Sequence, residues 1–135
     1  MQNKLVRFVL DYNGRRSLFP EDFSKIGILN VSDRVKQLRL GHVFNIHKGK
    51  APVFLSQGFD RAERRYTTRS SPLNFTVSQA KGVGVNTFYY NGVRDWNSLP
   101  HEAKSANCRN TFKLLVKHYL SNQSTLVFND PFIFY

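Results

Sequence analysis

The chain has 135 residues, of which 41% are hydrophobic and 14% aromatic, so its composition is not that of a disordered protein and one domain with its own core is expected. Its single cysteine excludes an internal disulfide and a zinc knuckle built on paired cysteines, which suits an intracellular location, nucleus or cytoplasm. The net charge of +11 favours nucleic acid as a partner, because lysine and arginine release counterions from a phosphate backbone; an anionic membrane surface is the competing partner.

The first two elements are predicted to be helices. Residues 2–12 carry apolar side chains at intervals of three and four, and Asn13-Gly14 ends this helix because both residues accept the left-handed conformation of a C-cap. Its inward face is expected to consist of Leu5, Phe8, Val9 and Tyr12. Pro20 begins a second, short helix that Gly27 ends. The two carboxylates after Pro20 fit the positive end of the helix dipole, which explains them more simply than a metal site does.

The longest helix is predicted from Asp33 to Lys48, with Ser32 as its cap and Gly49 just beyond its end. Its apolar side is expected to consist of Val35, Leu38, Val43, Phe44 and Ile46. A glycine in its middle, Gly41, suits the close approach of another helix. The two histidines of this helix are five residues apart and share a face poorly, so a metal pair is the less favoured interpretation.

A short helix or turn at Pro52–Leu55 precedes residues 57–71, which hold four arginines and no apolar periodicity. We expect an extended loop that binds nucleic acid, because arginine and tyrosine stack on bases and the guanidinium fork matches phosphate; an ordinary charged surface loop is the alternative. The loop residues expected to contact nucleic acid are Arg61, Arg64, Arg65, Tyr66 and Arg69. Further phosphate contacts are expected at Arg15, Arg16, Lys48 and Lys50.

A strand is predicted next, because apolar and polar residues alternate from Leu73 to Val77. Lys81–Gly84 is expected to form a hairpin-type turn, with a second short strand over Val83–Thr87. The two glycines of this turn do not make a phosphate loop, since no lysine followed by serine or threonine comes after the second one.

The stretch Asn86–Pro100 predicts the central helix of the fold. Its apolar stripe has helical spacing and includes the only tryptophan of the chain. The stripe consists of Phe88, Tyr89, Val93 and Trp96. Because tryptophan and phenylalanine bury the largest areas, we expect this helix to nucleate the core, with Arg94 and Asp95 on its solvated face.

A helical turn at His101–Ser105 and a last helix over Cys108–Leu120, capped by Asn107, complete the predicted elements. The fold class is therefore mainly α, with four to five helices and one short β-strand or hairpin element around residues 72–86. We expect a single helical domain over residues 1–121, with the basic loop at 57–71, and a poorly patterned tail over 122–135.

Five segments carry a resemblance in a fixed order along the chain. They are Leu29–Leu38, Gly49–Leu55, the basic run Thr68–Ser71, the aromatic helix that runs into Asp95–Pro100, and Asn110–Lys113. Together they resemble the C-terminal region of reverse transcriptases from non-LTR retrotransposons of the LINE-like, jockey/CR1 type, over most of residues 2–121. The resemblance implies a thumb-like segment that follows the catalytic palm and holds template–primer or element RNA. It also implies a truncated or fragmentary copy, with fingers and palm upstream.

The chain alone is expected to be no enzyme and to need no metal or cofactor. Polymerase catalysis requires aspartates that hold two metal ions, and no Asp-Asp pair occurs here. The expected partners are RNA or DNA and the upstream polymerase domains, with no membrane. Two alternatives stay open. One is a helical protein-interaction or structural domain whose charge serves solubility; the other is a small enzyme, for which Cys108 at a helix start is the nearest candidate.

Overall fold

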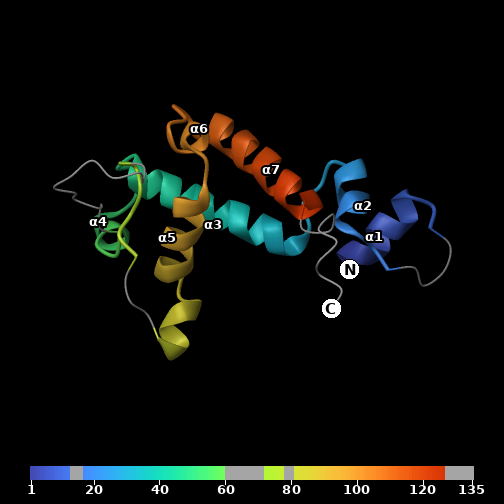
Figure 1. Cartoon of the computed structure of the whole chain (residues 1–135), viewed down its shortest axis with the longest axis horizontal. Coiled ribbons are helices and arrows are strands. Elements are labelled where there is room, and N and C mark those ends of the chain that lie inside the picture. The colour runs from blue at the N-terminus through green and yellow to red at the C-terminus, as the bar shows by residue number, and fades with distance from the viewer. Residues whose placement is uncertain (13–16, 60–71, 78–80, 127–135) are drawn as a thin grey trace. The chain divides into compact units, whose positions relative to one another are not determined.

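Figure 1 shows a computed structural model of the chain, which describes residues 1–12, 17–59, 72–77 and 81–126. Over these residues the protein is mainly α, as predicted, but it has seven α-helices where four to five were predicted. The helices are α1 (Gln2–Val9), α2 (Pro20–Lys25), α3 (Val31–His47), α4 (Val53–Ser56), α5 (Phe88–Ser98), α6 (His101–Lys104) and α7 (Arg109–Leu126), with one 3₁₀ helix, η1 (Gly82–Asn86), before α5.

The chain divides into two compact units. The first unit comprises Met1–Val35 and Lys117–Tyr135, and the second unit comprises Lys36–Val116. The division falls within α3 and within α7, so each of these helices contributes residues to both units. The expectation of one domain over residues 1–121 stays a prediction.

Helix α1 lies in the first unit, and its predicted inward face is wrong. Only Val6 is buried, whereas Leu5, Phe8 and Val9 are 60%, 84% and 59% exposed. Periodicity identifies an apolar stripe on a helix, but it does not say which neighbour the helix packs against, and here the neighbour meets Val6. The helix also ends earlier than predicted, at Val9. The predicted stop at Asn13-Gly14 lies outside the described residues.

Helix α2 begins and ends as predicted. Asp22 accepts a hydrogen bond on Oδ2 from the backbone N–H of Phe19, at 2.9 Å, so its carboxylate caps the helix. Its Oδ1 accepts a second bond from the hydroxyl of Tyr12, at 2.8 Å. Gly27 has a φ of +69° beyond the C-terminus, which a glycine adopts without strain.

Helix α3 begins at Val31, and the predicted cap Ser32 is wrong. Asn30 caps the helix, because its Oδ1 accepts the backbone N–H of Asp33 at 2.9 Å and its Nδ2 donates to the Asp33 carboxylate at 2.8 Å. The C-terminus is as predicted: α3 ends at His47, and Gly49 has a φ of +68°. Asn30 stands three residues before Asp33, a spacing typical of reciprocal capping.

The buried side of α3 agrees with the prediction in its second half and differs in its first. Val43, Phe44 and Ile46 are buried as expected, but Val35 and Leu38 are 48% and 50% exposed. The inward positions of the first half are taken by Asp33, Gln37 and Leu40. Two of these three residues, Asp33 and Gln37, are polar, so apolar periodicity does not identify the inward face of this half of the helix.

Helix α5 of the second unit lies where predicted, but only half of its predicted apolar stripe is buried, since Phe88 and Tyr89 are each 36% exposed. Thr87 caps it, since its hydroxyl accepts the backbone N–H of Tyr90 at 3.3 Å. Trp96 and Val93 are buried, and the ring of Trp96 lies 5.8 Å from that of Phe112. Phe112 in turn stacks on Phe44 of α3, with ring centroids 4.4 Å apart. The core of this unit is therefore aromatic and joins α3, α5 and α7.

The predicted strand over Leu73–Val77 is wrong: within the described residues, only Phe75 has a β-bridge. The backbone of this segment bonds to side chains of α5 instead. Trp96 Nε1 donates to the carbonyl of Leu73 at 2.9 Å. Asn97 donates to the carbonyl of Phe75 at 2.8 Å and accepts its N–H at 3.0 Å. These bonds satisfy the backbone groups that a neighbouring strand would otherwise satisfy.

The hairpin-type turn and second strand predicted over residues 81–87 are also wrong, because η1 occupies this part of the chain. Helices α6 and α7 confirm the last two predicted elements, and Phe112, Val116 and Leu120 are buried. The predicted cap Asn107 is replaced by Cys108, whose Sγ lies 3.5 Å from the backbone N–H of Thr111. Helix α7 continues through Leu126, so the first residues of the expected tail are helical; residues 127–135 are not described.

Candidate nucleic-acid interface

Seven of the nine residues expected to contact nucleic acid lie outside the described part of the chain. They are Arg15, Arg16, Arg61, Arg64, Arg65, Tyr66 and Arg69. The described residues that flank the basic segment 60–71 are well anchored in the second unit, since Phe59 and Phe75 are both buried and their ring centroids are 5.4 Å apart. The described residues on either side of the basic segment therefore pack against the same part of the aromatic core.

The other two predicted contacts, Lys48 and Lys50, follow the C-terminus of α3. Lys48 places Nζ 5.5 Å from the ring centroid of Phe44, a cation–π distance, and Lys50 is exposed. Hydrogen bonds with the hydroxyl and the backbone N–H of Thr111 are the main causes of a lowered pKa of the Cys108 thiol at the start of α7. The charge of Lys50 makes the smallest contribution to this lowered pKa.

Helices α3 and α7 run in opposite directions where they meet in the second unit. Gln37 Nε2 donates to the carbonyl of Lys113 at 2.9 Å, and Phe44 stacks on Phe112. This pairing places Arg109 over Gly41: its Nη2 lies 3.8 Å from the position that a Cβ on Gly41 would occupy. The close approach of another helix that was expected at Gly41 is therefore not found there.

A pocket of about 230 Å³ that is open to solvent lies between the two helices on the second unit. Its lining consists of Gln37, Leu38, Gly41, Arg109, Asn110, Phe112 and Lys113. Two of these residues are cationic and none is acidic. Sequence reasoning missed Arg109 and Lys113 as site residues, although their spacing of four on a helix indicates that they share a face. The sequence does not reveal that this face meets a glycine of α3.

Positive charge is concentrated in the second unit. Its described residues include nine lysines and arginines and only two carboxylates, a formal charge of +7, whereas the described residues of the first unit sum to +1. The nine cations are Lys36, Arg39, Lys48, Lys50, Lys81, Arg94, Lys104, Arg109 and Lys113. The two carboxylates are Asp95 and Glu102.

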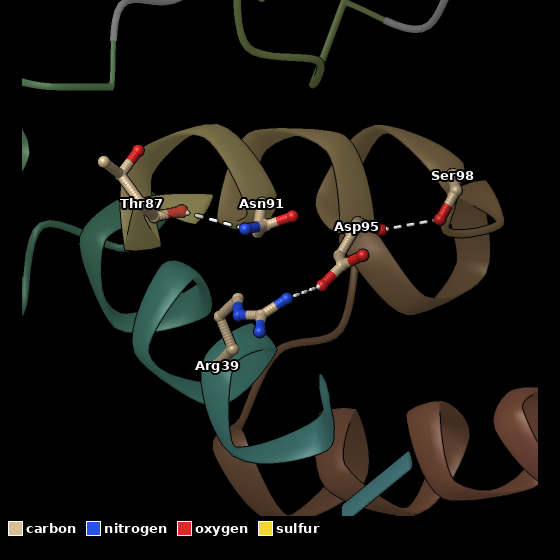
Figure 2. A network of polar contacts seen from close by, with 5 residues as sticks. All are labelled: Arg39, Thr87, Asn91, Asp95 and Ser98. Atoms are coloured by element: carbon tan, nitrogen blue, oxygen red, sulfur yellow. Dashed lines mark hydrogen bonds and ion pairs between the residues drawn. The ribbon is translucent and has the colours of Figure 1, made fainter. Parts of the chain in front are cut away.

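One of those carboxylates is occupied by an ion pair that joins α3 to α5 (Figure 2). Arg39 Nη1 lies 2.6 Å from Asp95 Oδ2, and both side chains are largely covered. Asp95 is thus less solvated than predicted, whereas its neighbour Arg94 is exposed as expected. Figure 2 also shows Ser98 Oγ donating to the carbonyl of Asp95 at 2.7 Å. Arg39 and Asp95 serve the packing of the helices rather than an exposed charged surface.

Lys104 is a further cation with an internal role. It is buried, and its Nζ donates to Asn74 Oδ1 at 2.8 Å and to the carbonyl of Asn97 at 3.0 Å. Burial lowers the pKa of its ammonium group, because desolvation disfavours the charged form. With Arg39 and Lys104 assigned to the interior, the described part of the second unit keeps seven cations for contact with a polyanion.

The described residues show neither a group of three or more histidine, cysteine, aspartate or glutamate side chains placed to hold a metal ion nor a helix long and apolar enough to cross a membrane. No protein-family model matches the chain, and no curated protein or solved structure matches it either.

Proposed function

We propose that this chain binds RNA or DNA through its phosphate backbone, as the C-terminal, post-palm segment of an RNA-directed DNA polymerase of the non-LTR retrotransposon type. The observation that carries the proposal is the charge of the second unit, +7 over its described residues, with one of its two carboxylates already paired with Arg39. Such a charge attracts any polyanion, and neutralising phosphates releases condensed counterions.

Two sets of cations support phosphate contact in this proposal. The first set is the arginines of the segment 60–71, whose flanking residues Phe59 and Phe75 are packed together. The second set is the described cations around the meeting of α3 and α7, which are Lys48, Lys50, Arg109 and Lys113. The family assignment rests on the sequence resemblance alone. On this proposal the chain contributes binding and no chemistry, since it has no Asp-Asp pair to hold polymerase metals.

A protein-interaction domain is the second candidate, and helix α1 favours it. Leu5, Phe8 and Val9 are exposed on that helix, and contiguous exposed apolar side chains are typical of protein–protein contacts. This candidate predicts that the charge of the chain serves solubility, so that nucleic-acid binding is absent or insensitive to which cations are removed.

The experiment is fluorescence anisotropy with a labelled single-stranded RNA and a labelled RNA–DNA duplex, over about 50 to 200 mM salt. Wild type is compared with a variant in which four loop arginines become alanine, namely Arg61, Arg64, Arg65 and Arg69. Log affinity should fall linearly with log salt for wild type, and the variant should lose about 3 to 4 from the magnitude of the slope.

A charge-matched control removes four cations of the first unit, by changing Lys4, Lys25, Arg34 and Lys117 to alanine. This control carries the same net charge as the loop variant, so it should keep the wild-type slope if the loop arginines touch phosphates. Equal slopes for the two variants would show that only net charge matters and would remove the loop from the interface. No salt-dependent binding by wild type would reject the proposed function and favour the interaction domain.

A further inference from the structure

The pocket between α3 and α7 has the composition of an anion site. Arg109 and Lys113 line it, and its lining contains no carboxylate. Neither residue takes part in an ion pair within the described ranges, where the ion pairs involve Asp22 and Asp95. The guanidinium of Arg109 is held over the pocket, since its Nη2 lies 3.8 Å from the Cβ position of Gly41. A guanidinium and an ammonium group from two residues that line one pocket can bind a phosphate together.

The rest of the lining suits what is attached to a phosphate in a nucleic acid. Leu38 and Phe112 supply apolar surface, and Asn110 supplies an amide. A volume of about 230 Å³ is below the range of roughly 300 to 1,000 Å³ that holds drug-sized ligands. The pocket is therefore large enough for one phosphate with part of its sugar, and too small for a longer piece of strand.

Packing between protein atoms does not explain why a glycine stands at position 41, beside this pocket. A glycine inside a helix costs roughly 1 kcal/mol relative to alanine. No protein atom outside its own helix backbone and chain neighbours would come closer than 3.8 Å to an added Cβ, so an alanine would fit. A larger side chain at this position would fill the pocket instead. An uncharged side chain larger than alanine at position 41 would therefore fill the space in front of Arg109 without changing the charge of the protein.

We propose that this pocket seats one backbone phosphate of a bound nucleic-acid strand, held between Arg109 and Lys113, with Gly41 leaving room for the adjoining sugar. The inference rests on the proposed function and adds a defined contact to it. It differs from general attraction to a basic surface, because it predicts that an uncharged substitution will weaken binding in a salt-dependent way.

The test is the anisotropy salt series with labelled single-stranded RNA and four variants of the full chain. They are Gly41→Leu, which fills the pocket; Gly41→Ala, which leaves it open; Arg109→Gln with Lys113→Gln, which removes its charges; and the three substitutions Gly41→Leu, Arg109→Gln and Lys113→Gln together. Far-UV circular dichroism and urea denaturation of each variant check that it folds.

Filling the pocket and removing its charges should each lower the magnitude of the salt slope by about 1 and weaken binding about fivefold at 0.1 M salt. Gly41→Ala should keep the wild-type slope. The triple variant should lose no more slope than either alone, because all three substitutions abolish the same contact. If Gly41→Leu does not fold, Gly41→Met takes its place as the uncharged variant that fills the pocket.

Four results would overturn the inference. An unchanged slope in the pocket variants, with a steep wild-type slope, would reject the pocket and leave the proposed function standing. Additive losses in the triple variant would show that Arg109 and Lys113 act outside the pocket. Amide shifts of residues 109–113 with inorganic phosphate, but no effect of the variants on RNA binding, would assign the pocket to a free anion. A wild type that binds no RNA at any salt would reject both proposals.

Discussion

Three consecutive side chains of α5 each have a structural partner. Asp95 pairs with Arg39, Trp96 donates to the carbonyl of Leu73, and Asn97 makes two bonds to the backbone of Phe75. The stretch Asp95–Pro100 carries much of the sequence resemblance, yet its side chains are accounted for by packing and hydrogen bonding within the second unit. The most recognisable residues of the chain therefore build its scaffold, and the proposed contacts with nucleic acid lie elsewhere.

Changing Asn97 to alanine should lower the free energy of unfolding by about 1 to 3 kcal/mol, because it leaves the N–H and C=O of Phe75 without their side-chain partner. Asn91→Ala is the matched control on the same helix. The Asn91 amide donates to the carbonyl of Thr87 one turn away, and its loss should cost within about 0.5 kcal/mol. Urea denaturation measures both values; equal losses would show that Asn97 does not anchor the segment.

Helix caps illustrate what sequence reasoning misses at the scale of single residues. Asn30 and Ser32 are both good caps and stand two positions apart, and the structure uses Asn30 because Asp33 can bond to it in return. The spacing of Asn30 and Asp33 was readable from the sequence. The cap of α7 was not, since Cys108 rarely serves as one and the better candidate Asn107 precedes it.

Two glycines inside helices have opposite roles at the scale of elements. Gly92 of α5 is buried, and a Cβ there would lie 3.1 Å from Val43 Cγ2 and 3.3 Å from Phe59 Cζ. Gly41 of α3 has no such neighbours. The close approach that the sequence suggested at Gly41 is found at Gly92, because a glycine shows that a contact is allowed without showing which helix uses it.

These environments predict opposite signs for the same substitution. Gly92→Ala should lower the free energy of unfolding by about 1 to 3 kcal/mol, since overpacking against Val43 and Phe59 outweighs the gain in helix propensity. Gly41→Ala should raise it by up to about 1 kcal/mol. Urea denaturation of the two single variants gives both values. A stabilising Gly92→Ala would contradict the described packing of α5 on α3.

Elements were predicted best where apolar periodicity agrees with burial. In α5 and α7, Trp96, Phe112 and Val116 are both periodic and buried, and the helices lie where expected. The predicted strand at residues 73–77 failed because its alternation comes from an irregular segment whose backbone bonds to side chains distant in sequence. A pattern of single residues contains no information about such partners.

The distribution of charge is the main property of the whole molecule that bears on function. The sequence gives a net charge of +11, but not that the described residues of the second unit hold +7 and those of the first unit +1. Nor could the sequence show that Arg39 and Lys104 are used internally. The proposal of nucleic acid as the partner comes from composition, whereas the pocket of Arg109 and Lys113 required the pairing of α3 with α7.

The measurement that tests the central claim most directly is an NMR titration of the full, ¹⁵N-labelled chain with a short single-stranded RNA at low salt. The account predicts shifts of amides in the second unit, including Lys50 and residues 109–113, that reverse when salt is added. Amides of α1 should not move. An absence of shifts at every RNA concentration, or shifts confined to the first unit, would contradict the claim that this chain binds nucleic acid through the cations of its second unit.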